Sequence, residues 1–157
     1  MNITDSARAF ALLSTSIADA LIACWRSKYD YAYWRPITAI RLADTDGNPA
    51  TKPDATWMSL VQTPPYPDYV SGHASGTGAA TGTFSYLFGA RSIDLDISSS
   101  VTMTTRHYDS AAALDAETMN ARIWLGIHFR KAMTDANRLG HRTASWTITH
   151  EFRPLHH

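Results

Sequence analysis

Apolar residues recur every three or four positions near the start of the chain. This stripe consists of Phe10, Leu13, Ile17, Leu21 and Cys24. Such spacing is typical of an amphipathic helix, and it predicts one over about 5–29 with Thr4 or Asp5 as its cap. Cys24 then lies on the packed face, where a small buried thiol behaves as an apolar residue.

Glycines and prolines divide the rest of the chain. Residues 43–70 contain Gly47 and five prolines, which predicts a long loop with one short element at Trp57 to Val61. We expect further helices over about 72–88, over about 110–122 with Asp109 or Ser110 as cap, and from about 128 onward. A break near Gly126 separates the last two. The alternation of Ile93, Leu95 and Ile97 suggests a short extended stretch or a loop.

Composition limits the possible classes of protein. The chain has 157 residues, 45% of them hydrophobic, so we expect a single domain over 1–157. Fourteen basic and fourteen acidic residues give zero net charge, which provides no general attraction to nucleic acid or to a lipid surface. We find no secretory signal and no uninterrupted apolar window long enough to span a membrane. A soluble protein is expected, with the cytoplasm as the default location.

Three short segments carry polar residues at spacings that packing alone does not explain. Lys28 and Arg35 flank the exit of the first helix, although each alone is typical of an ordinary surface charge. Ser71, Gly72 and His73 open the glycine-rich helix. There a hydroxyl and free amides form either an anion site or simply a helix cap.

The third segment places Arg122 and His128 on either side of an apolar turn. We expect Trp124, Leu125 and Ile127 to anchor this turn in the core. A snorkelling arginine and a core histidine would be the structural alternative. Together, the three segments supply three cations, a hydroxyl, a helix-start amide and two histidines. That set is suited to binding a compact tetrahedral oxyanion.

These segments resemble, in order, the three-part signature of the superfamily of vanadium-dependent haloperoxidases and type 2 phosphatidic acid phosphatases. The matching text runs from Lys28 to Pro36, through Val70-Ser71-Gly72-His73, and from Arg122 to His128. The flanking stretches YWRPITAI, PPYPDYVSGHAS and ARIWLGIHFR are similar to the soluble bacterial haloperoxidase branch. The resemblance implies an all-α helical bundle of about five helices with a long proline-rich loop.

The resemblance also implies roles for individual residues. The oxygens of vanadate would be held by Lys28, Arg35, Ser71, Gly72 and Arg122. His128 would ligate the metal, His73 would act as acid and base, and Lys28 would polarise bound peroxide. The enzyme would then be a peroxidase that oxidises halide with hydrogen peroxide.

Two alternatives remain open at this point. In an acid phosphatase, phosphate would occupy the same site, His128 would be the nucleophile, and His73 would protonate the leaving group of a phosphate monoester. A catalytically weak oxyanion-binding or assembly protein would do neither reaction.

The chain departs from the superfamily pattern in several respects, among them Val70 in place of the usual proline of the second segment and Ala121 in place of the usual serine of the third. Ala132 stands where the phosphatases carry an aspartate that orients the nucleophilic histidine, and Asp135, Asp109 or Asp68 could substitute. Haloperoxidases of this branch are also longer, so the chain resembles a short or C-terminal-half version. We expect a homodimer, or another partner, to cover its exposed apolar helix faces. The candidates for lining the halide pocket are Tyr33, Trp34, Trp57 and His107.

Overall fold

The computed structural model describes residues 2–89 and 93–153. Within them, four long helices form an all-α bundle: α1 (Ile3–Tyr31), α3 (Gly72–Phe88), α4 (Ala111–Trp124) and α5 (Arg130–His150). A short helix α2 (Pro36–Arg41) and a 3-10 turn η1 (Ala43–Thr45) follow α1. The antiparallel hairpin of β1 (Leu95–Ser99) and β2 (Thr104–Tyr108) precedes α4.

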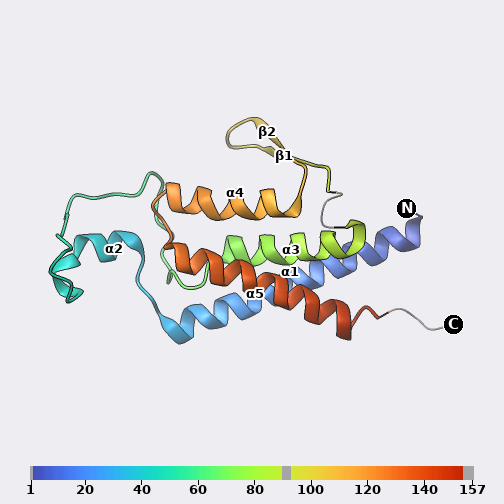
Figure 1. The fold of residues 1–157 in the computed structure, drawn as a ribbon, viewed down its shortest axis with the longest axis horizontal. Helices are drawn as coiled ribbons and strands as arrows, with labels where there is room; N and C mark the ends of the chain where they lie inside the picture. The colour runs from blue at the N-terminus through green and yellow to red at the C-terminus, as the bar shows by residue number, and fades with distance from the viewer. Residues whose placement is uncertain (1, 90–92, 154–157) are drawn as a thin grey trace.

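The direction of the helices brings distant parts of the sequence to one end of the bundle. The C-terminal ends of α1 and α4 meet the N-terminal ends of α3 and α5 there (Figure 1). The chain termini lie at the opposite end, and α2 stands away from the bundle (Figure 1). The three polar segments of the sequence all fall at the end where these helices converge.

Small residues set how closely the helices pack. A Cβ atom on Gly140 of α5 would overlap the Ser75 carbonyl and the Ala79 amide of α3, so the two backbones touch. On α1 the innermost line of residues is Leu12, Ser16, Ala20, Cys24 and Lys28. Because this line ends at Lys28, the packing that stabilises the bundle also carries a lysine into its interior.

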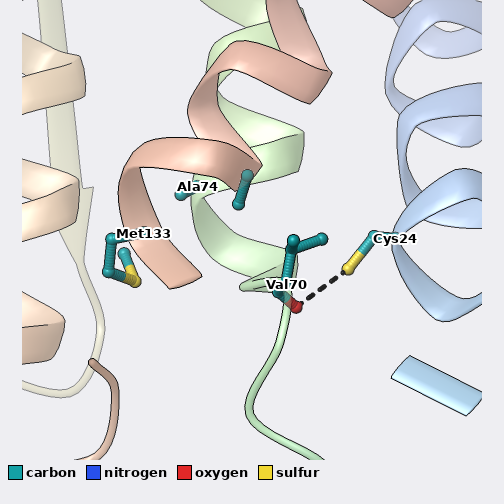
Figure 2. Close-up of a cluster of buried hydrophobic side chains, with 5 residues drawn as sticks. Cys24, Val70, Ala74 and Met133 are labelled. Atoms are coloured by element: carbon teal, nitrogen blue, oxygen red, sulfur yellow. Dashed lines mark hydrogen bonds between the residues drawn. The ribbon is translucent and has the colours of Figure 1, made fainter. Parts of the chain in front are cut away.

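The loop before α3 is attached to the core beside this line. The buried thiol of Cys24 donates to the Val70 carbonyl at 3.3 Å (Figure 2). Ala74 and Met133 belong to the same buried apolar cluster. Burial raises the pKa of the Cys24 thiol, which therefore stays protonated. Cys24 is thus the small buried thiol that the sequence predicts.

Several sequence predictions match the structure, and others need correction. The helix over 72–88 and the Ser110 cap of α4 are confirmed. The cap of α1 is Asn2, which accepts from the Asp5 amide at 2.9 Å, and not Thr4 or Asp5. The extended stretch at Leu95 and Ile97 is real, but it pairs with a second strand that was not predicted.

Other corrections concern burial and the long loop. Phe10 is 70% exposed and Trp124 is 67% exposed, whereas Ile127 is buried as expected. No helix or strand forms at Trp57 to Val61, and α2 was missed because Pro36 begins that helix as its first residue. The apolar segment Ile3–Arg41 meets the length and hydropathy of a membrane span, a test that core helices of soluble proteins also pass. The expected homodimer stays a prediction.

Candidate active site

Two buried cations hold the proline-rich loop at the convergent end of the bundle. Lys28 Nζ donates to the carbonyls of Pro67 (2.7 Å) and Asp68 (3.1 Å). Arg35 donates through Nε to the Tyr66 carbonyl (2.7 Å) and through Nη1 to the Ile127 carbonyl (2.8 Å). Most lysines and arginines are solvated surface charges. Lys28 and Arg35 are not, since Lys28 is 1% and Arg35 4% exposed.

The Lys28 ammonium is destabilised by its surroundings. Burial is the largest cause, the charge of Arg35 acts in the same direction, and together they lower its pKa to about 8. At neutral pH the side chain is still mostly protonated. A negatively charged ligand would therefore find a desolvated cation at this position.

A tight turn delivers His128 to the same place. Gly126 adopts φ +74°, and a Cβ there would overlap the ring of Trp57, so this position requires glycine. The turn buries Ile127 and His128 just before α5 begins. Trp57, a candidate for the halide pocket, packs on this turn instead.

Asp68 orients the imidazole of His128. Nδ1 of His128 lies 2.7 Å from Asp68 Oδ1, and both side chains are at most 2% exposed. Because a carboxylate only accepts, Nδ1 carries the proton and the lone pair is left on Nε2. Nε2 lies 3.5 Å from Arg35 Nη1. Burial is the main cause that lowers the pKa of His128, so its neutral form is favoured.

This contact identifies the substitute for the missing aspartate at Ala132. Of the three alternatives named from sequence, only Asp68 reaches His128. Asp135 instead pairs with Lys131 at 2.8 Å and accepts from the Tyr69 hydroxyl at 2.9 Å. Asp109 is exposed and lies between β2 and α4.

Two buried guanidinium nitrogens at this end of the bundle lack partners. Arg35 Nη2 and Arg122 Nε are buried and donate to no described residue. Buried charged donors are rarely left unpaired, because the cost of desolvation is not recovered. The same end of the bundle therefore has an unmet requirement for acceptors, as expected where an oxyanion binds.

The N-terminus of α3 adds further donors. Ser71 is fully buried and caps the helix by accepting weakly from the Ala74 amide at 3.5 Å. The amides of the first helical turn have no intrahelical partner, so Gly72 and His73 present them outward. A Cβ on Gly72 would meet nothing within 4 Å, which shows open space beside it.

His73 lines the cavity beside Lys28 and is exposed to solvent. Desolvation, reinforced by Arg122, His128 and Arg35, lowers the pKa of His73 to about 4. The ring is therefore neutral at pH 7. A bound anion would offset these positive charges and raise the pKa again.

An open cavity of about 430 Å³ lies beside Lys28 and the N-terminus of α3. Its wall includes Lys28, Gly72 and His73 together with two aromatic residues that the sequence did not single out, Trp25 and Tyr66. The Tyr66 ring lies over both cations, with its centroid 5.2 Å from Lys28 Nζ and 4.8 Å from Arg35 Cζ. Trp25 packs on Tyr66 at 5.0 Å between ring centroids.

The aromatic candidates named from sequence lie elsewhere. Tyr33 lines a separate cavity, Trp34 a groove along the proline-rich loop, and His107 pairs with Asp96 on the exposed hairpin. Spacing along the chain could have pointed to Trp25, three residues before Lys28 on the same helix. Nothing local indicates that Tyr66 folds back over the two cations.

The residues fit an oxyanion better than a metal held by protein ligands alone. Within residues 2–89 and 93–153, no group of three or more His, Cys, Asp or Glu side chains could hold a metal ion. Vanadate requires donors for its oxygens and one nitrogen for its metal atom. The unpaired nitrogens of Arg35 and Arg122, with Nε2 of His128, form that set of groups.

Comparison with known proteins identifies the family. The sequence model of the VCPO second helical-bundle domain matches residues 8–156. The chain belongs to this family. It is 29% identical to the vanadium chloroperoxidase of Curvularia inaequalis over 83% of its own length and 28% of that protein.

Solved structures of similar fold are also vanadium enzymes. The structure described as the first bacterial vanadium-dependent iodoperoxidase has a TM-score of 0.78 and 29% identity, and covers 90% of this chain. An apo-type bacterial vanadium-dependent chloroperoxidase also has a TM-score of 0.78, but at 20% identity its likeness establishes the fold alone. The chain spans 32% and 37% of these two proteins, so it matches about a third of a whole haloperoxidase.

Proposed function

We propose that this chain provides the vanadate site of a vanadium-dependent haloperoxidase, which oxidises halide with hydrogen peroxide. The observation that carries the proposal is the pair of unpaired buried guanidinium nitrogens, on Arg35 and Arg122, beside a histidine whose free nitrogen is fixed by Asp68. Bound vanadate would supply a Lewis acid that activates peroxide toward halide.

Each residue has a distinct task in this proposal. Arg35, Arg122, Lys28, the Ser71 hydroxyl and the Gly72 amide would hold the oxygens, and Nε2 of His128 would ligate the metal atom. Asp68 keeps the proton on Nδ1 and so leaves the lone pair on Nε2, which Arg35 Nη1 faces at 3.5 Å in the free site. Lys28 would also polarise bound peroxide.

His73 would exchange protons with the outer oxygen of the bound group. Its pKa of about 4 makes it a proton acceptor at neutral pH in the free site. When an anion is bound, the raised pKa would allow the same ring to return the proton. Tyr66 and Trp25 would limit the entry of water from one side.

One observation supports an acid phosphatase as the second candidate. The superfamily phosphatases need an oriented histidine nucleophile, and Asp68 orients His128 despite Ala132. The same donors would hold phosphate. His73 would have to act as an acid to protonate the leaving group, and its pKa of about 4 in the free site means that it would take up this proton only once a bound phosphate raises the pKa.

Dye halogenation separates these candidates. We expect the purified chain to halogenate a phenolic dye only when vanadate, peroxide and halide are all present, with phosphate competing against vanadate. Release of phosphate from an aryl ester without peroxide, inhibited by vanadate, would replace the first candidate by the second. Vanadate binding with neither activity would leave an oxyanion-binding protein and overturn both.

A further inference from the structure

A second cavity lies beside Asp68, the partner of His128. It has a volume of about 600 Å³ and shares no lining residue with the cavity that holds Lys28 and His73. Asp68 lines it, and this residue contacts Nδ1 of His128. The lining is completed by Tyr31, Tyr33, Tyr69, Phe129, Lys131 and Ala132. We call this space the tyrosine cavity.

The walls of the tyrosine cavity are aromatic. Tyr31 packs edge-on against Tyr69 with ring centroids 5.0 Å apart, and Tyr33 packs edge-on against Phe129 at 6.0 Å. Tyr31 is 66% and Tyr33 51% exposed, which is unusual for large aromatic side chains in a folded domain. Ring faces and edges at these spacings favour a planar aromatic ligand.

One polar group of the tyrosine cavity lacks a partner. Asp68 Oδ2 is buried and accepts no hydrogen bond from any described residue. The other candidate polar group, the Tyr69 hydroxyl, already donates to Asp135. An unpaired buried carboxylate oxygen favours a ligand that carries a hydrogen-bond donor.

Nearby charges indicate whether that hydrogen-bond donor is neutral or cationic. Lys131 stands at the rim, 2.8 Å from Asp135, and Lys28 Nζ lies 3.1 Å from the Asp68 carbonyl on the inner side. The positive charges of Lys131 and Lys28 would repel a cationic ligand, whereas they would not repel a neutral hydroxyl. The small Ala132 side chain leaves the space that a ring would fill.

We propose that the tyrosine cavity binds a neutral phenolic ring, whose hydroxyl donates to Asp68 Oδ2. The ring would lie among Tyr31, Tyr33, Tyr69 and Phe129. Asp68 would then contact the phenol through one oxygen and His128 through the other. Occupancy of this cavity does not require an oxyanion in the proposed vanadate site.

Ligand titration followed by NMR tests the proposal. The probes are p-cresol and p-xylene, which have the same size and differ by a hydroxyl in place of a methyl group. We expect saturable binding of p-cresol, about tenfold tighter than p-xylene, the difference expected for a hydrogen bond to a carboxylate. The His128 ring signals should move on binding while those of His141 stay in place.

Two variants locate the bound ring. Ala132→Leu fills the tyrosine cavity and should abolish p-cresol binding, whereas Ala113→Leu on an exposed position of α4 should leave it unchanged. If Ala132→Leu lowers the melting temperature strongly, Tyr33→Ala removes one half-exposed wall and should weaken binding at least several-fold.

The proposal is overturned by p-cresol and p-xylene binding equally, by no saturable binding, or by unchanged affinity in both cavity variants. Vanadate titration of the same samples keeps this test separate from the proposed function. If the chain binds vanadate but not p-cresol, only the proposed phenol site is refuted. If it binds p-cresol but not vanadate, only the proposed vanadate site is refuted.

Discussion

Two aspartate–histidine pairs in the bundle have nearly the same nitrogen–oxygen distance but very different surroundings. His128 lies 2.7 Å from Asp68, and His141 of α5 lies 2.8 Å from Asp115 of α4. In the second pair, the other carboxylate oxygen accepts from Thr81 of α3 at 2.9 Å. That pair therefore connects three helices, and both of its carboxylate oxygens have donors.

The first pair differs in what lies around it. The His128 side chain is 2% exposed, against 39% for His141, and its second nitrogen faces Arg35. Asp68 keeps one oxygen unpaired, and unpaired guanidinium nitrogens lie nearby. A histidine held by a carboxylate is thus not a site by itself; unsatisfied groups around it are what distinguish a site from a structural contact.

The largest contrast is expected from removing each histidine. His128→Ala should abolish vanadate binding, measured by calorimetry or vanadium NMR, because the nitrogen ligand is lost. His141→Ala should bind vanadate with unchanged affinity and only melt at a lower temperature. Equal affinity in His128→Ala and the parent would refute the assigned ligand. Circular dichroism of His128→Ala provides the folding control, because the variant leaves Asp68 buried without its partner.

A smaller loss is expected from removing one unpaired arginine. Arg122→Ala should weaken vanadate binding by about 1.5 to 3 kcal/mol, the scale of a hydrogen bond to a charged group. Arg142→Ala, at an exposed position of α5, is the matched control and should have no effect. An Arg122→Ala variant that binds as tightly as Arg142→Ala would mean that Arg122 Nε is unpaired for another reason.

The contrast between the two pairs also explains what sequence could predict. The three segments with Lys28, Ser71 and His128 were recognisable because they match, in order, the three-part signature of the superfamily. The α3 boundaries followed from an abrupt change to small residues and a closing glycine. Both signals lie within short stretches of sequence, so they can be recognised without knowledge of the fold.

Contacts between distant segments could not be predicted in the same way. Asp68 and His128 are sixty residues apart, and nothing in the sequence separates Asp68 from Asp135 or Asp109 as the orienting group. Phe10 was expected on the packed face of α1, but it is exposed. The apolar spacing fits more than one face of this helix, and the face that is buried includes the polar residues Ser16 and Lys28. The choice of face depends on how closely α3 and α5 approach.

Neutralising each carboxylate should affect the two pairs in different ways. Asp68→Asn should weaken vanadate binding by about tenfold, because the amide fixes the tautomer of His128 less well. Asp115→Asn should leave vanadate affinity unchanged and lower the melting temperature, since Thr81 and His141 lose a charged acceptor. Vanadate calorimetry and thermal melts on both variants measure this difference. Equal vanadate affinities would remove Asp68 from the site.

The smallest effect concerns the pH dependence of the free site. The folded pKa of His73 is about 4, below its ordinary value of 6.5, so the unfolded chain binds the extra proton more readily between these values. The contribution of His73 to the free energy of unfolding is therefore fully present above pH 6.5 and is lost as the pH falls toward 4. Because the ring is partly exposed, solvent screening reduces the loss to about 1 kcal/mol.

Denaturant unfolding of the parent and of His73→Asn from pH 7 to pH 4 should show a shallower decline in the variant, with exposed His150→Asn as the control. Parallel curves for the parent and His73→Asn would show that neither desolvation nor the neighbouring positive charges lower the pKa of His73.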